Sequence, residues 1–314
     1  MKDTLFAIGE ALIDFIPDKY GCDFSEVTAF APKIGGAPTN VLGAFAKLGG
    51  KTRLCTQLGN DPFGDKISDA LKQYNIGTEF VTRTDAANTA LAFVSLSADG
   101  ARTFSFYRNP SADMLYTAEN LKKSDFKNCF ALHFCSVSLG DFPMKDAHRR
   151  AIEFAKQNGA IISFDPNLRF PLWKSREDLK AAVIEFLAYA DIIKISDEEL
   201  SFITETDNVQ EGCQRLLKTA KLVLHTCGAD GAYAFTSNAQ AFSPSEKIKA
   251  IDTTGAGDAF CGSFLYNLYQ NGIDRDGLER LSETELKSYL AASNKYCGES
   301  VQRFGAIESY PNTL

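Results

Sequence analysis

The sequence predicts an α/β protein built on a doubly wound, mainly parallel β-sheet flanked by helices, with a small β-sheet added to it. Three observations predict this fold. Between about residues 131 and 226, short apolar runs alternate with stretches of helical length, which is typical of parallel strands joined by helices. Several helical stretches end at glycine, as helices commonly do. A strand–turn–strand pattern between residues 90 and 107 interrupts the alternation and predicts the added sheet.

The first elements follow the alternation of strand and helix. Leu5–Gly9 is predicted to be a buried first strand, and Pro38–Leu48 a helix that ends at a glycine pair. Arg53–Leu58 predicts the next strand. Asp61 then opens a helix that stops before Asn75.

The added sheet is predicted from two parts of the chain. Ala90–Ser97 and Arg102–Tyr107 are strand-like runs joined by Ala98-Asp99-Gly100, and Asp-Gly is a strong hairpin signal. Residues 14–33 have few helical features and supply the remaining strands. Such a sheet is often a lid over a site, although an extension of the sheet edge explains the pattern equally well.

The alternation returns in the second half of the chain. Helices are predicted at Met144–Asn158 and Arg176–Tyr189. Ligands of such sheets bind beyond the carboxyl ends of the strands, so the residues just after each strand are the candidates for a site. The predicted strands are Ala131–Ser136, Ala160–Phe164, Ile192–Ile195 and Leu222–Thr226.

The composition limits the class of partner. The 314 residues show no repeat and no low-complexity linker, so residues 1–314 are expected to form a single domain. With 33 basic and 40 acidic residues the net charge is −7, which argues against nucleic acid or an anionic membrane as the main partner. Glu10 and Asp14 break the first apolar run, so no signal peptide is expected, and no run is long enough to span a bilayer.

The cysteines indicate a reducing compartment. All eight are scattered without a CxxC pair, so we expect reduced thiols and a cytoplasmic protein. His133 and Cys135 could share a metal, but they alternate along an apolar strand, which favours a packing role.

The segment Asp252–Phe264, DTTGAGDAFCGSF, carries the strongest chemical signal. A glycine-rich turn that enters a helix points backbone N–H groups and the positive end of the helix dipole at one place, which makes an anion site. Asp258 beside that site could accept a proton from a hydroxyl during phosphoryl transfer, or it could be a helix N-cap. The sequence contains no GxxxxGK[ST] motif, which excludes a Walker-type nucleotide site.

A second glycine pair also precedes a helix. Gly35 and Gly36 in IGGAPTN would let the backbone approach a small polar ligand, and Asn40 can both donate and accept hydrogen bonds. Asp14 ends a short apolar run and could bind two hydroxyls at once. Taken singly, turn chemistry explains each of these residues.

Two arginines are candidates for binding an anionic group. Arg169 follows the strand that ends in Ser163-Phe164-Asp165 and suits a phosphate oxygen, or it forms a surface salt bridge. Arg108 could reach a ligand from the hairpin, or it is solvated.

The last two strand ends offer candidates for metal and nucleotide. Glu199 in KISDEEL could hold Mg²⁺ through water, but Ser196 to Glu199 is also a good capping box. In LHTCGADG, Thr226, Gly228 and Gly231 could line a nucleotide, and an Asp-Gly turn between strands explains them as well.

Together these segments resemble the PfkB (ribokinase-like) carbohydrate kinase family over about Phe6–Pro311. GGAPTN is similar to the first family signature, and DTTGAGDAFCGSF is similar to the second. Residues 106–116, 165–173 and 190–204 are most similar to fructokinases. The resemblance implies a doubly wound α/β domain with a small β-sheet lid, and a possible homodimer through that lid.

The resemblance also assigns roles to residues of this chain. It implies that Asp258 is the base and that Gly255, Ala256 and Gly257 form the anion hole for the γ-phosphate. Asp14, Gly35, Gly36 and Asn40 then match positions that hold sugar hydroxyls, while Thr226, Gly228 and Asn294 match nucleotide positions. Asp252 and Thr254, with backbone near Gly305 and Ser309, resemble a monovalent-cation site.

The implied function is phosphorylation of D-fructose at the 6-hydroxyl by ATP, with Mg²⁺ and with help from K⁺. Ser196 departs from the Asn-x-x-Glu motif of many family members and is similar to plant-type fructokinases, so Mg²⁺ and phosphate dependence stay open. Two alternatives also stay open. One is the same chemistry on 2-keto-3-deoxygluconate, ribose or another sugar, since Arg108 and Arg169 would suit an acidic sugar. The other is a non-catalytic sugar sensor.

Overall fold

A nine-stranded sheet forms the centre of the computed structural model, which describes residues 2–19, 21, 22, 24–96 and 102–314. The strand order in this sheet is β13-β12-β11-β10-β9-β8-β1-β4-β5, and neighbours are parallel except in the pairs β11–β12 and β12–β13. The strands are β1 Thr4–Ile8, β4 Lys51–Gly59, β5 Ile76–Thr84, β8 Cys129–Cys135, β9 Ile161–Asp165, β10 Ile192–Ser196, β11 Leu222–Thr226, β12 Gly231–Phe235 and β13 Gln240–Pro244.

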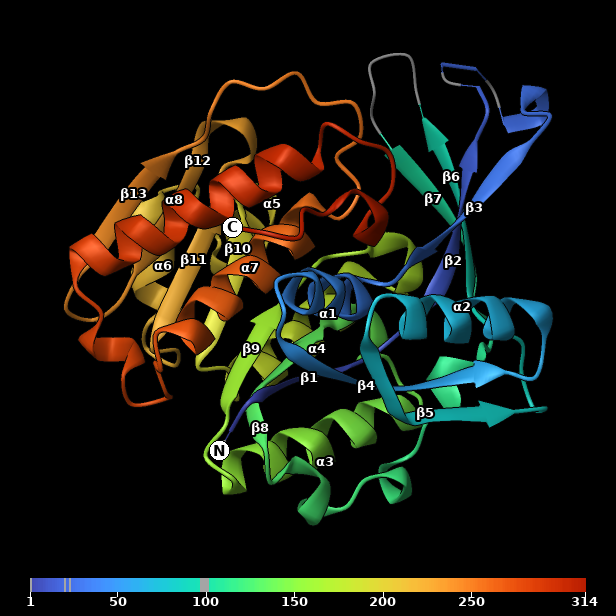
Figure 1. Cartoon of the computed structure of the whole chain (residues 1–314), viewed down its shortest axis with the longest axis horizontal. Helices are drawn as coiled ribbons and strands as arrows, with labels where there is room; N and C mark the ends of the chain where they lie inside the picture. The colour runs from blue at the N-terminus through green and yellow to red at the C-terminus, as the bar shows by residue number, and fades with distance from the viewer. Residues whose placement is uncertain (1, 20, 23, 97–101) are drawn as a thin grey trace.

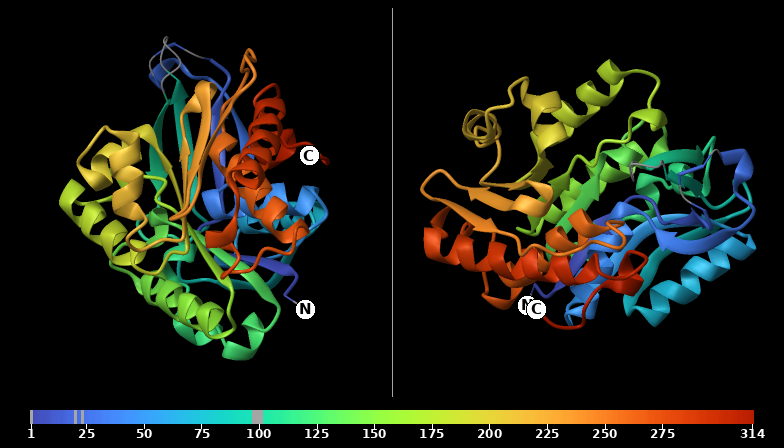
Figure 2. Two further views of the ribbon diagram at one scale, coloured as in Figure 1. Left: turned by 90° about the vertical axis from the view of Figure 1, so that its left-hand side faces the viewer. Right: turned by 90° about the horizontal axis from the view of Figure 1, so that it is seen from above.

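Helices cover both faces of the large sheet, as Figure 2 shows. Their bounds are α1 Ala37–Lys47, α2 Pro62–Gln73, α3 Pro143–Gln157, α4 Arg176–Leu187, α5 Asp197–Thr204, α6 Val209–Leu216, α7 Ala256–Gln270 and α8 Glu283–Ser300. Side chains alternate across a strand, so Leu5 and Ala7 of β1 join the core under α1, α2, α7 and α8, whereas Phe6 and Ile8 join the core under α3 to α6. The predicted doubly wound α/β fold is confirmed.

A separate four-stranded sheet projects from one side of the large sheet (Figure 1). Its order is β3-β2-β6-β7, with the strands β2 Leu12–Pro17, β3 Phe30–Gly35, β6 Leu91–Leu96 and β7 Arg102–Tyr107. We call it the small sheet. The turn Ala98-Asp99-Gly100, which predicted the hairpin, lies outside the described residues, but β6 and β7 pair antiparallel as expected.

The inner face of the small sheet is turned toward the large domain, and the outer face is partly exposed, with Phe15 packed on Phe63 of α2. Leu12, Ala90 and Ala92 pack with Phe104 and Phe106 on the inner face. The outer face is aromatic, as described below. None of the helices in the described part of the chain combines the length and apolar character needed to cross a bilayer.

Candidate active site

Two cavities meet at the segment that links Thr253 to Asp258. The first, of about 450 Å³, lies between the small sheet and the large domain, and Gly255 and Asp258 line it. The second, of about 250 Å³, is lined by Ala256 and Gly257. Thr253 lines both cavities. The glycine-rich turn therefore divides two adjoining spaces, which suits the transfer of a group from a ligand in one to a ligand in the other.

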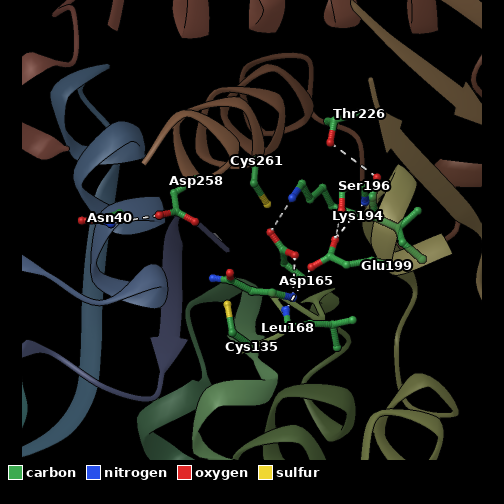
Figure 3. A network of polar contacts seen from close by, with 12 residues as sticks. Asn40, Cys135, Asp165, Leu168, Lys194, Ser196, Glu199, Thr226, Asp258 and Cys261 are labelled. Atoms are coloured by element: carbon green, nitrogen blue, oxygen red, sulfur yellow. Dashed lines mark hydrogen bonds and ion pairs between the residues drawn. The ribbon is translucent and has the colours of Figure 1, made fainter. Parts of the chain in front are cut away.

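Asp258 lies in the first turn of α7, at the floor of the first cavity. The N-cap of this helix is Gly255, so the interpretation of Asp258 as an N-cap is wrong. Its Oδ2 instead accepts a hydrogen bond of 2.9 Å from Nδ2 of Asn40 on α1 (Figure 3). Burial raises the pKa of Asp258, while Asn40, Lys194 and Arg169 act to lower it. A buried carboxylate with a raised pKa, facing a cavity, suits a general base.

The distance between Asn40 and Asp258 is set by a close contact of α1 with α7. A Cβ on Gly262 of α7 would lie 2.6 Å from the carbonyl oxygen of Val41 on α1. Only glycine lets the two helices approach this far. The contact places the amide of Asn40 and the carboxylate of Asp258 within hydrogen-bond distance.

The glycine-rich turn is shaped for close approach. Gly255 has a φ of 71°, in the left-handed region that favours glycine, and its carbonyl accepts a 2.8 Å hydrogen bond from the hydroxyl of Tyr310. The turn delivers the N-terminus of α7, with its positive dipole end, to the border of the two cavities. This geometry suits the binding of an anion.

A buried lysine lies directly beneath the turn. Nζ of Lys194, in β10, is 3.2 Å from where a Cβ of Gly257 would be, and 3.1 Å from Oδ2 of Asp165 at the end of β9 (Figure 3). Burial alone would lower the pKa of Lys194, but the negative charges of Asp165 and Glu199 raise it overall. The lysine therefore brings a positive charge to the underside of the glycine-rich turn.

Lys194 and Asp165 were not predicted as site residues, although the sequence contained a signal. A lysine inside the otherwise apolar run Ile192–Ile195 is unusual, and an aspartate ends the strand next to it. Burial raises the pKa of Asp165 to about 7, against the lowering effect of Lys194. Asp165 therefore has two roles: Oδ1 accepts a 3.1 Å hydrogen bond from the N–H of Asn167 in the turn after β9, and Oδ2 pairs with the buried Lys194.

Arg169 lines the first cavity, as the sequence analysis expected of a residue at the active edge. Its guanidinium lies 5.8 Å from the ring centroid of Phe104 on β7, and its charge contributes to lowering the pKa of Asp258. It thus joins the inner face of the small sheet to the surroundings of Asp258.

Arg108 fits neither interpretation of the sequence, which placed it at a ligand or in solvent. Its side chain is neither in solvent nor on the lining of the first cavity: it is 3% exposed and forms a buried ion pair with Asp113. It also donates to the carbonyl of Val137 and the hydroxyl of Ser138. Because burial forces an arginine to pair with acids, Arg108 anchors the end of β7 to the large domain.

Glu10 is a residue of the cavity that the sequence analysis missed. It is 2% exposed and lines the first cavity. It accepts hydrogen bonds from the N–H of Ala37 at the start of α1 and from the hydroxyl of Ser138. Burial raises the pKa of Glu10. No periodic pattern marks a lone glutamate after a strand as a helix anchor.

The glycine pair positions Asp14 at the first cavity. Asp14 lies within β2 and lines the cavity together with Gly36. Gly35 does not line it, but a Cβ on Gly35 would lie 2.0 Å from Oδ2 of Asp14, so glycine is required to make room for that carboxylate. Gly36 has a φ of 102°. Asp14, Gly36 and Asn40 are thus brought together around one cavity.

Glu199 lines neither cavity. Its carboxylate forms the capping box of α5 with Ser196 and accepts a 3.0 Å hydrogen bond from the N–H of Leu168. The capping-box interpretation is confirmed, and water-mediated Mg²⁺ binding by Glu199 stays a prediction. Its neighbour Glu198 lines the first cavity.

The second cavity contains all four residues predicted for the nucleotide. Thr226, Gly228, Gly231 and Asn294 line it. Asn294 of α8 donates a 2.8 Å hydrogen bond to the carbonyl of Ser243. Strand ends and a distant helix therefore converge here as expected.

The predicted cation residues are only partly brought together. Asp252 accepts hydrogen bonds from the N–H and hydroxyl of Thr254 and from the N–H of Gly305. Ser309 is buried and donates from its hydroxyl to the carbonyl of Ala306. The hydrogen bond from Gly305 to Asp252 holds the segment after α8 against the glycine-rich turn. Carboxylate, hydroxyl and carbonyl oxygens are ligands that fit a hard cation.

Comparison with known proteins identifies the family to which this chain belongs. The model of the pfkB family of carbohydrate kinases matches residues 2–313. The chain belongs to this family. It is 39% identical to fructokinase-1 of Zea mays over 312 residues, which cover 99% of this chain and 95% of that protein.

Solved structures of related kinases have the same fold as this chain. A fructokinase from Xylella fastidiosa with bound ATP has a TM-score of 0.90 and 34% identity, and the match covers 99% of this chain and 96% of that one. A fructokinase double mutant from Vibrio cholerae O395, with fructose, ADP and potassium ion bound, has a TM-score of 0.86 and 31% identity, over 99% and 96% of the two chains.

Proposed function

We propose that this pfkB kinase transfers the γ-phosphoryl group of ATP to the 6-hydroxyl of D-fructose. One observation carries the proposal: Asp258 faces the first cavity from the same turn whose Ala256 and Gly257 line the second. A sugar in the first cavity and a nucleotide in the second would thus meet at the turn.

The mechanism follows from the positions of the chain's own groups. Asp258 accepts the proton of the attacking hydroxyl, and Asn40 holds the carboxylate in place. The N–H groups of the turn and the charge of Lys194 stabilise the negative charge that develops on the transferred phosphoryl group. Asp14 and Asn40 hold the sugar hydroxyls, and Arg169 stands beside the transfer point.

The choice of fructose is supported by the relatives. Curated proteins 39% identical to this chain are named fructokinases, and a similar structure contains fructose. 2-Keto-3-deoxygluconate and ribose are the competing acceptors. Since Arg108 is paired with Asp113, Arg169 is the arginine at the cavity that would meet an acidic sugar.

The test is turnover of ATP with a panel of sugars, in the wild type and in Asp258→Asn. We expect fructose to be preferred and Asp258→Asn to lower kcat by about 10³-fold, because a general base contributes on that order. Calorimetry should show that the variant still binds fructose. Preference for the keto-acid would overturn fructose as the substrate, and near-normal turnover in Asp258→Asn would overturn the base. Sugar binding without ATP consumption by the wild type would indicate a sensor.

Mg²⁺ and K⁺ complete the proposal. Mg²⁺ would accompany the nucleotide and neutralise phosphate charge, with Glu199 reached through water and Glu198 at the cavity wall. K⁺ would bind near Asp252, Thr254 and Ser309, whose oxygens suit a hard cation and whose segment supports the turn.

We further propose a cytoplasmic homodimer formed through the outer face of the small sheet. All eight cysteines are free thiols, which suits a reducing compartment. On the outer face Phe15 stacks on Phe93 at 4.7 Å, and Tyr107 and Phe24 remain 65% and 48% exposed. An exposed aromatic patch of this kind fits a second copy of the same face.

A further inference from the structure

A cluster of three possible metal ligands lies beside the second cavity. Asp197, His225 and Cys227 each offer a ligand atom, and these atoms lie within 4.8 Å of one another. The sheet register brings them together: Ser196 at the end of β10 pairs with Thr226 at the end of β11. The next residues, Asp197 and Cys227, therefore leave the sheet at the same level.

The contacts within the cluster bring the three donor groups together. Sγ of Cys227 lies 3.3 Å from Nδ1 of His225. Nε2 of His225 lies 3.0 Å from Oδ1 of Asp197, and the side chain of His225 is 0% exposed. A thiol and a carboxylate thus flank one buried imidazole.

The alternative of a thiol nucleophile with a histidine base is disfavoured by position, because neither Cys227 nor His225 lines the first or the second cavity. Burial raises the pKa of Cys227 to about 11, and the charge of Asp197 adds to this effect. A nucleophilic cysteine needs the opposite shift. Burial also lowers the pKa of His225, which keeps its imidazole neutral and able to act as a metal ligand.

We propose that Asp197, His225 and Cys227 bind a thiophilic divalent transition-metal ion, for which Zn²⁺ is the best match. One thiolate, one imidazole and one carboxylate form a donor set that zinc accepts, with water as a fourth ligand. Asp197 is 69% exposed at the start of α5 and can move inward to close the site. Binding would replace the thiol proton of Cys227 by the metal.

The location gives the site a potential influence on the nucleotide. Thr226 and Gly228, the neighbours of Cys227 in the chain, both line the second cavity. A bound ion would tie this rim to the first turn of α5. The three ligands themselves do not line either cavity.

The test is a titration of the purified full-length chain, free of metal, with Co²⁺. A thiolate-to-cobalt charge-transfer band should rise to one equivalent and disappear when Zn²⁺ is added. Cys227→Ser should remove the band, and Asp197→Asn should weaken binding by roughly tenfold or more. Cys22→Ser, which changes a partly exposed thiol on the small-sheet side, should leave the band unchanged.

A second measurement guards against a misfolded variant. One equivalent of Zn²⁺ should raise the Tm of the wild type but not that of Cys227→Ser, because an ion that binds the folded state stabilises it. A band that persists in Cys227→Ser, or the absence of a band in the wild type, would overturn the site. Neither readout needs kinase activity, so failure here leaves the proposed function untouched.

Discussion

At the scale of single residues, two opposing effects act on the pKa of Asp258. Burial raises its pKa, and the amide of Asn40, at 2.9 Å, is the first of the groups that lower it. Sequence alone could place Asp258 after a glycine-rich turn. It could not reveal Asn40 as its partner, because the two residues are 218 positions apart and meet only when α1 packs on α7.

Asn40→Ala should therefore shift the pH dependence of turnover. The base must be ionised to accept a proton, so kcat is lost as pH falls through the pKa of Asp258. Removing the hydrogen bond to the charged form raises that pKa further, and the acid limb should move to higher pH. The measurement is kcat against pH at saturating fructose and ATP. Asn267→Ala, on the same helix as Asp258 but bonded to Ser263, is the control, and superimposed profiles for Asn40→Ala and wild type would contradict the idea.

At the scale of elements, the carboxyl ends of the parallel strands gather the charges of the site. The alternation of strands and helices predicted this edge correctly, and β8 to β11 begin and end within two residues of their predicted positions. Strand β5 was missed, because Ile76–Thr84 carries more polar than apolar residues and only part of it is buried. The Lys194–Asp165 pair was missed because a sequence pattern shows neither the pairing of β9 with β10 nor the depth of burial.

Lys194→Met should destabilise the fold by about 3 kcal/mol, because it leaves acids buried without their partner. This loss of folding stability should grow with rising pH. Without Lys194 the folded-state pKa of Asp165 lies even further above its unfolded value, so the folded state holds a proton that the unfolded state releases. The free energy of unfolding from urea titrations at pH 6 and pH 8 measures this.

The double variant Lys194→Met/Asp165→Asn provides the matched comparison for this pair. Because it removes both charges, it should recover part of the lost stability and flatten the pH dependence. Equal unfolding free energies for the wild type and Lys194→Met at both pH values would contradict the buried ion pair as a stabilising contact.

At the scale of the whole molecule, the two faces of the small sheet differ in role: one lines the first cavity, and the other carries the proposed dimer interface. Phe104 and Phe106 on the inner face line the first cavity, while on the outer face Phe15 packs on Phe63 of α2 and Tyr107 remains exposed. The hairpin pattern predicted that such a sheet exists. Which face meets the large domain depends on Arg108 and its buried acid Asp113, and a sequence pattern does not reveal that anchor.

Tyr107→Asp should shift the chain from dimer to monomer. A charge placed on an exposed aromatic face must be desolvated in an interface, which opposes association. Sedimentation at matched concentrations measures the mass. Ile184→Asp, at a residue 51% exposed on α4, is the control and should leave the mass unchanged. A wild type that sediments as a monomer, or a Tyr107→Asp variant that stays dimeric, would contradict the proposed interface.

The contact of Gly262 with the backbone of Val41 has a consequence for how this enzyme could acquire a new acceptor. Any side chain at Gly262 would push α7 away from α1 and so spoil the relation between Asn40 and Asp258 for every acceptor alike. The contact between α1 and α7, which places Asn40 beside Asp258, must therefore stay unchanged in any variant selected or engineered for a new acceptor. Freedom to accommodate another substrate resides in Phe106, which lines the first cavity from the small sheet, more than in Phe104, which contacts Arg169 beside Asp258. Libraries that vary Phe106, with α1, α7 and Phe104 held constant, are the route to altered acceptor choice.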